Sequence, residues 1–163
     1  MIVKRISERY MCTLVSLCIF TAAAFVGPLI RFIVWPPSRI GEIASFRVDR
    51  FIYDLIFLLW PTQSLAVMEV NVGTPMAITV AIGSNILLYA TTGIVAGLVS
   101  GRRIALLTIY LLVCVLVTLF ALWGAGSDLA FVNVIALALA LVFYAIPFWV
   151  VTGLGQRVDS SLG

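Results

Sequence analysis

The stretch from Met76 to Gly101 constrains the fold of this chain most, because it holds no charged residue and is closed by Arg102 and Arg103. A helix needs roughly 20 apolar residues to cross the hydrocarbon core of a bilayer, so this stretch is predicted to span a membrane. The composition agrees, since 63% of the 163 residues are hydrophobic and 10% are charged, against about 25% charged in soluble domains. We therefore expect an all-α membrane protein with a single transmembrane domain over residues 1–163.

Four segments have the length and apolar character of membrane spans, and together they predict a four-transmembrane-helix bundle. Their approximate limits are 11–31, 75–100, 104–123 and 129–151. The first could instead be a signal peptide that is cleaved after the small residues Ala22-Ala23-Ala24. Its apolar run is long for a signal core, so an uncleaved helix is favoured.

Three features are expected near the ends of these spans. Pro28 and Pro147 should each kink a helix. An aromatic belt is expected near the inner surface, because aromatic side chains prefer the level of the lipid headgroups. The polar tail 152–163 is expected to lack fixed structure. The residues assigned to the belt are Phe143, Tyr144, Phe148 and Trp149.

The segment from about 39 to 70 is predicted to lie at the interface or to re-enter the membrane without crossing it. It is interrupted by charged and proline residues, and its apolar run near Leu55 is too short for a full span. Charge distribution supports this topology. With both termini in the cytoplasm, six basic residues lie inside and four outside, as the positive-inside rule favours. We expect an integral protein of a bacterial-type inner or plasma membrane.

Small residues recur every fourth position along the second predicted span and predict a face for close helix packing. Residues four apart lie on one side of a helix, and glycines at that spacing let two backbones approach in lipid. The partner helix could belong to this chain or to a second protomer. The residues of this face are Ala77, Ala81, Gly93, Gly97 and Gly101.

Polar side chains inside the spans are the next candidates for function. Asn85, Tyr89 and Thr92 lie in the second span, and Asn133 could approach them from the fourth. Such groups commonly form hydrogen bonds between helices. The alternative is that they line a path for an ion or a substrate.

Asp54 and Glu69 are the carboxylate pair that could form a reactive site on the outer side. Paired carboxylates can exchange protons or hold a divalent cation. Ion pairs with nearby Arg39, Arg47 and Arg50 are the simpler interpretation. The sequence contains no histidine, and its three cysteines, Cys12, Cys18 and Cys114, form no metal-binding motif. No cofactor or metal is expected, and an enzyme is not favoured.

Three functional hypotheses follow. The first is a non-enzymatic protein that acts by helix association, as an accessory or structural subunit of a membrane complex or as a homo-oligomer. The second is a small channel or transporter subunit, and the third is a membrane enzyme at the outer surface. The net charge is +3. Because the basic residues lie beside the apolar spans, they are assigned to membrane orientation and not to nucleic acid binding. The expected partners are the lipid bilayer and another membrane protein or a second copy.

Overall fold

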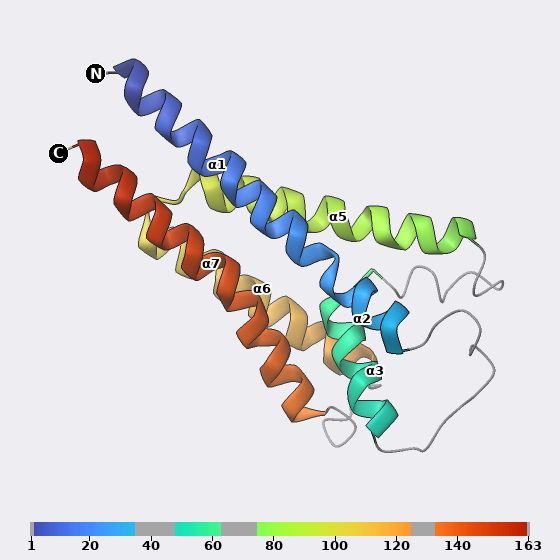
Figure 1. The fold of residues 1–163 in the computed structure, drawn as a ribbon. Coiled ribbons are helices and arrows are strands. Elements are labelled where there is room, and N and C mark those ends of the chain that lie inside the picture. Colours follow the sequence, from blue (N-terminus) through green and yellow to red (C-terminus); the bar gives the residue numbers. More distant parts are fainter. Residues whose placement is uncertain (1, 35–47, 63–74, 125–132, 163) are drawn as a thin grey trace.

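A computed structural model describes residues 2–34, 48–62, 75–124 and 133–162 (Figure 1). Within these ranges the chain is helical and contains no strand, which confirms the all-α prediction. Four of its helical segments are long and apolar enough to cross a membrane. The helices are α1 (Ile2–Ala24), α2 (Val26–Val34), α3 (Val48–Leu59), α5 (Pro75–Leu98), α6 (Arg103–Gly124) and α7 (Val134–Leu162).

The four long helices contact one another in the order α5–α1–α7–α6. Figure 1 shows both chain termini at the same end of the molecule, where α1, α5 and α7 lie closest. Toward the opposite end α5 diverges from α6 and α7, and the short helices α2 and α3 lie in the space between them. α3 accordingly contacts α2, α7 and α6.

The first span is broken at Phe25, close to the kink predicted at Pro28. The Phe25 N–H donates to the Ala22 carbonyl at 3.2 Å, and regular bonding resumes where Leu29 N–H donates to the Phe25 carbonyl at 2.8 Å. Proline has no N–H, so Pro28 cannot bond the carbonyl four residues earlier, that of Ala24. The helix therefore bends here and leaves one buried carbonyl in need of a donor.

α3 does not have the length of a membrane span. Its 12 residues extend about 18 Å at the α-helical rise, whereas a bilayer core is about 30 Å thick. Leu58, Leu59 and Trp60 at its carboxyl end are almost fully buried. The rest of the segment predicted at 39–70 lies in residues 35–47 and 63–74, outside the described residues. Within the described residues, the structure thus places one short helix in the segment that was predicted to lie at the interface or to re-enter the membrane.

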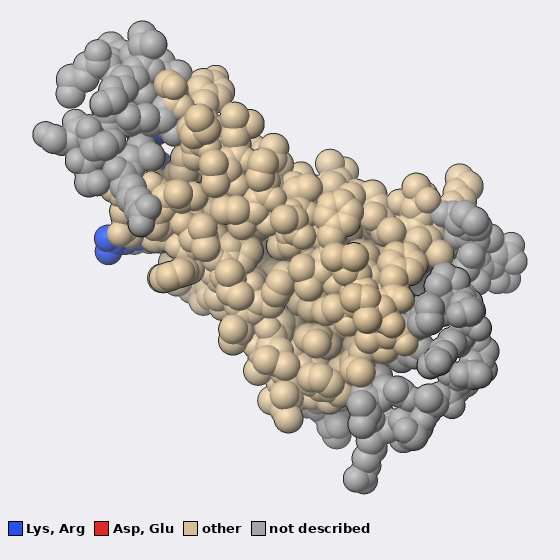
Figure 2. Space-filling view, viewed as in Figure 1, with Lys and Arg blue, Asp and Glu red and all other residues tan. Residues whose placement is uncertain are grey.

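α6 is the most exposed of the four candidate spans. Only 11% of its apolar window is buried, against 22–33% in the other three. On the face shown in Figure 2, Lys and Arg side chains lie only near the end that carries the termini, and the remaining described surface is uncharged. Exposed aliphatic side chains follow the whole length of α6: Ile104, Leu107, Leu111, Leu112, Val115, Leu116 and Leu119.

α7 differs from the predicted fourth span at both ends. It begins at Val134 and continues to Leu162, so the tail expected to lack structure extends the helix. Residues 125–132 are outside the described residues. The expected aromatic belt is also wrong in part, because Tyr144 and Phe148 are buried and Trp149 is exposed. Phe148 packs edge-on against Phe20 of α1, with ring centroids 5.0 Å apart, and so belongs to the core.

Candidate functional site

Two glycines of the predicted packing face lie directly against α1. A Cβ atom added to Gly97 would stand 2.6 Å from the Cα of Thr13, and one added to Gly93 would stand 2.9 Å from the Cβ of Phe20. Both distances are shorter than real Cβ contacts. The Ser16 hydroxyl uses this proximity to donate a 2.7 Å hydrogen bond to the Gly93 carbonyl. In this structure the neighbour of the glycine face is therefore a helix of the same chain.

The other residues of the predicted face have different surroundings. Ala81 is fully buried. Ala77 lies in the first turn of α5, and its side chain is outside the described set. Gly101 is exposed in the turn between α5 and α6. Within this face, the close approach to α1 is seen at Gly93 and Gly97.

Two tyrosines bind the carboxyl end of α3 inside the molecule, and we call Tyr89 and Tyr144 the tyrosine pair. Tyr144 donates to the Leu58 carbonyl at 2.7 Å. The Tyr89 hydroxyl lies 2.9 Å from the Tyr144 hydroxyl and 3.1 Å from the Leu59 carbonyl, so its single proton can serve either oxygen. The last carbonyls of a helix lack intrahelical donors. The tyrosine pair supplies those donors where water is excluded.

The turn after α3 is tied to α5 through a single carbonyl. Trp60 donates its indole N–H to the Ala81 carbonyl at 3.3 Å, and Thr62 donates its hydroxyl to the same oxygen at 2.7 Å. Ile56 and Trp60 also pack against Ala81 in a small apolar cluster. Together with the tyrosine pair, these bonds hold the end of α3 to both α5 and α7.

Asn85 compensates for the break in the first span. Its side-chain amide is fully buried and donates to the Ala24 carbonyl at 2.7 Å. This is the carbonyl that Pro28 leaves without its helical donor. The Asn85 Oδ1 atom is buried and has no hydrogen-bond partner among the described residues. A polar side chain of α5 thus stabilises the bend between α1 and α2.

The pairing of Asn85 with the proline bend can be tested with a double-mutant cycle. We expect Asn85→Ala to destabilise the wild-type protein more than it destabilises Pro28→Ala, because alanine at position 28 supplies an N–H to the Ala24 carbonyl. The expected coupling is about 1 kcal/mol. It is measured from unfolding free energies in mixed micelles. The cavity left by the asparagine is common to both backgrounds and cancels, so additive effects would disprove the pairing.

The remaining polar candidates do not converge on Asn85. Thr92 donates to the Leu88 carbonyl of its own helix at 2.9 Å. The Asn133 Oδ1 accepts the N–H groups of Ile135 at 3.2 Å and Ala136 at 3.1 Å, which is the geometry of an N-cap. Of the four polar residues predicted to act together, the structure therefore brings only Asn85 and Tyr89 to the region where α1, α3 and α5 meet.

The structure describes only one of the two carboxylates, Asp54 and Glu69, that were predicted as a pair. Asp54 lies on α3 and is partly buried, whereas Glu69 falls in 63–74, outside the described residues. Among the described residues, no group of three or more His, Cys, Asp or Glu side chains could hold a metal ion. The three cysteines are free thiols, and Cys12 donates to the Ser100 hydroxyl at 3.2 Å.

Sequence reasoning missed several residues on which these contacts depend. A Cβ at Gly155 of α7 would stand 2.6 Å from the Ser100 carbonyl carbon, and one at Gly27 would stand 2.8 Å from the Trp60 Cβ. Tyr144 was assigned to the membrane surface, although it closes the α3 contact. The absence of an N–H on Pro28 was the one available signal, because it required a donor from another helix.

Comparison with known protein families, with curated proteins and with solved structures finds no match for this chain.

Proposed function

We propose that this chain is a non-catalytic accessory or structural subunit of a membrane complex, and that α6 presents its binding face to another membrane protein or a second copy. The bonding of the interior polar groups carries this proposal. The tyrosine pair, Asn85 and Ser16 all donate to backbone carbonyls of neighbouring helices. These polar side chains therefore serve to hold neighbouring helices in fixed positions.

The choice of α6 follows from its position at one end of the helix order. α6 contacts α7 and, at its far end, α3, whereas α1 packs between two long helices. Most of its exposed side chains are leucine, isoleucine and valine, from Ile104 to Leu119. Such a surface packs equally well against lipid chains or against another apolar helix. α6 is therefore the span with the most surface available for a partner.

In the same proposal the protein lies in a bacterial-type inner or plasma membrane with both termini in the cytoplasm. α3 then enters from the outer side and ends within the bilayer as a re-entrant helix. Non-helical backbone at membrane depth is tolerated where protein buries it and satisfies its polar groups. The bonds from the tyrosine pair, Trp60 and Thr62 to the end of α3 and to α5 meet that requirement.

Site-specific photo-crosslinking in native membranes tests the role of α6. A photoreactive amino acid is placed at Leu111, which is 53% exposed on α6, or at Leu87, which is 69% exposed on α5. We expect one polypeptide, or a second copy of this chain, to be crosslinked from Leu111. The control position Leu87 should yield lipid adducts only. Native mass spectrometry of the intact particle should then show that polypeptide in a fixed ratio.

A particle that contains one copy of this chain alone, with lipid adducts from both positions, would contradict the proposal. Protein crosslinks from Leu87 and none from Leu111 would remove α6 as the interface. Crosslinking of a second copy from Leu111 would show that this chain forms a homo-oligomer and is not a subunit bound to a different protein.

A channel or transporter subunit is a second candidate, because the end of α3 and the bend between α1 and α2 meet near Asn85. Interrupted helices at membrane depth form ion and substrate sites in many transporters, and the Asn85 Oδ1 atom has no partner among the described residues. A lone copy that makes liposomes permeable to small ions, with loss of that flux in Asn85→Leu, would favour this candidate over the first.

A further inference from the structure

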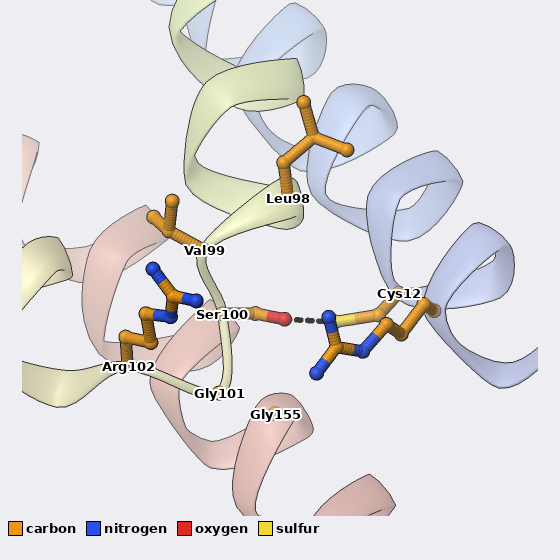
Figure 3. Close-up of a pocket in the computed structure, with 8 residues that line it drawn as sticks. Cys12, Leu98, Val99, Ser100, Gly101, Arg102 and Gly155 are labelled. Carbon is orange, nitrogen blue, oxygen red and sulfur yellow. Dashed lines mark hydrogen bonds between the residues drawn. The ribbon is translucent and has the colours of Figure 1, made fainter. Parts of the chain in front are cut away.

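A small pocket lies between α1, the α5–α6 turn and α7 (Figure 3). The helix ends around it face the end of the molecule that carries the termini (Figure 1). The pocket has a cavity volume of about 70 Å³. A water molecule needs about 10–15 Å³ on this measure, so the pocket has room for several waters or for one tetrahedral oxyanion. The residues used in the following argument are Arg9, Cys12, Leu98, Ser100, Arg102 and Gly155, and we call this the arginine pocket.

Each of the four candidate spans has one end at the arginine pocket or one residue from its lining. The first begins at Arg9, the second ends at Leu98, the third begins at Arg103, and the fourth ends at Gln156. If these helices cross a bilayer, the pocket lies where hydrocarbon gives way to lipid headgroups. The ends of four separate apolar segments agree on this position along the bilayer normal.

The polar wall of the arginine pocket suits a phosphate group. Arg9 and Arg102 line it, and the described residues that line it include no aspartate or glutamate. Guanidinium groups bind phosphate through paired, charge-assisted hydrogen bonds. The Ser100 hydroxyl, which accepts the Cys12 thiol proton, still has its own proton to donate.

The amino-terminal turn of α6 follows directly after Arg102, which lines the pocket. The first hydrogen bond of this helix runs from the Leu106 N–H to the Arg102 carbonyl at 3.1 Å. The N–H groups of residues 103–105 therefore have no acceptor within the helix. Such unpaired N–H groups and the helix dipole favour an anion at this end.

The other wall of the arginine pocket is apolar and continuous with the membrane-facing surface of α5. Leu98 lines the pocket and is 66% exposed. Val95 and Ile94 continue this exposed surface one turn deeper along the helix. A soluble phosphate gains nothing from contact with an apolar surface, whereas the acyl chain of a lipid could pack along it. We propose that the arginine pocket binds the phosphate of an anionic phospholipid, with an acyl chain against Leu98 and the α5 surface beyond it.

Lipid titration followed by native mass spectrometry of the full chain tests this site. Phosphatidylglycerol and phosphatidylcholine are the two probes, because both carry a phosphate and only the first has a net negative charge. We expect phosphatidylglycerol to remain bound preferentially. The double variant Arg9→Gln/Arg102→Gln should bind it at least about tenfold more weakly, as expected for the loss of a charge-assisted hydrogen bond.

Arg103→Gln is the matched control, because Arg103 is an exposed arginine next to the pocket and does not line it. We expect it to change binding less than about twofold, since it removes only a screened surface charge. An equal loss in Arg103→Gln would show a diffuse basic surface and overturn the pocket assignment. The single variants Arg9→Gln and Arg102→Gln replace the double variant if it does not fold, and each should then weaken binding measurably.

Inorganic phosphate at millimolar concentration separates a lipid from a soluble ligand. We expect it to leave phosphatidylglycerol bound, because it cannot use the apolar wall. Displacement of the lipid by phosphate, with the same dependence on Arg9 and Arg102, would assign the pocket to a soluble anion and overturn the lipid assignment. Equal retention of both lipids by the wild-type protein would also overturn it.

Discussion

Gly97→Leu is expected to destabilise the fold by about 3 kcal/mol, near the upper end of the usual cost of overpacking a well-packed contact. A Cβ at this position would lie 2.6 Å from the Cα of Thr13. That neighbour is backbone, so it cannot move aside by rotating a side chain. α1 and α5 would have to separate, which would also lengthen the Ser16–Gly93 hydrogen bond. The free energy of unfolding in mixed detergent micelles measures the loss.

Gly83→Leu is the matched control for this prediction. Gly83 is in the same helix, and a Cβ there would have no neighbour within 4 Å. Leucine at this position should be neutral or should stabilise by up to about 1 kcal/mol, because glycine is a poor helix former. Equal stability of the two variants would contradict the close packing of α1 on α5. A stable Gly97→Leu protein with a changed oligomeric state would show that the glycine face binds a second protomer.

Tyr144→Phe is expected to destabilise the fold by about 1–2 kcal/mol. The substitution keeps the aromatic ring and removes one hydroxyl. The Leu58 carbonyl, which accepts that hydroxyl at 2.7 Å, would remain buried without this donor. The Tyr89 hydroxyl would lose one of its two acceptors. Because this bond joins α3 to α7, the variant should also show faster hydrogen exchange at the carboxyl end of α3.

Tyr10→Phe is the control for Tyr144→Phe, since Tyr10 is 69% exposed and its hydroxyl can be replaced by solvent. We expect no change beyond about 0.5 kcal/mol, as is usual for surface substitutions. The double variant Tyr89→Phe/Tyr144→Phe should lose less than the sum of the single losses, because the two hydroxyls share one network. Additive losses, or unchanged exchange in α3, would contradict the role of the tyrosine pair.

Local patterns in the sequence predicted the elements of this fold. Uncharged apolar runs of sufficient length identified four candidate spans, because a long apolar helix depends only on residues next to one another. The separation of four residues between Gly93 and Gly97 predicted a face for close packing, and both glycines lie against another helix. The spacing did not show whether the partner helix belongs to the same chain or to a second protomer. Both cases need small residues at the same positions.

Features that depend on distant residues were not predicted. Tyr144 carries no local sign that its hydroxyl binds α3, and its position near the end of a span favoured the membrane surface instead. Gly155 looks like Gly153, two positions earlier, although only Gly155 contacts the backbone of Ser100. Asn133 was grouped with Asn85 as an interior polar residue, but the start of α7 makes it an N-cap. Each of these outcomes depends on where another helix lies.

The bond between Tyr144 and the end of α3 also bears on the order in which the protein is assembled in the cell. Tyr144 follows Leu58 by 86 residues, so a ribosome that adds 5–20 residues per second has completed α3 about 4–17 s before it adds this tyrosine. During that interval the last carbonyls of α3 lack the Tyr144 donor, and they lack both tyrosine donors until Tyr89 has been added. The end of α3 can therefore reach its final bonding only after Tyr144 of α7 has been added.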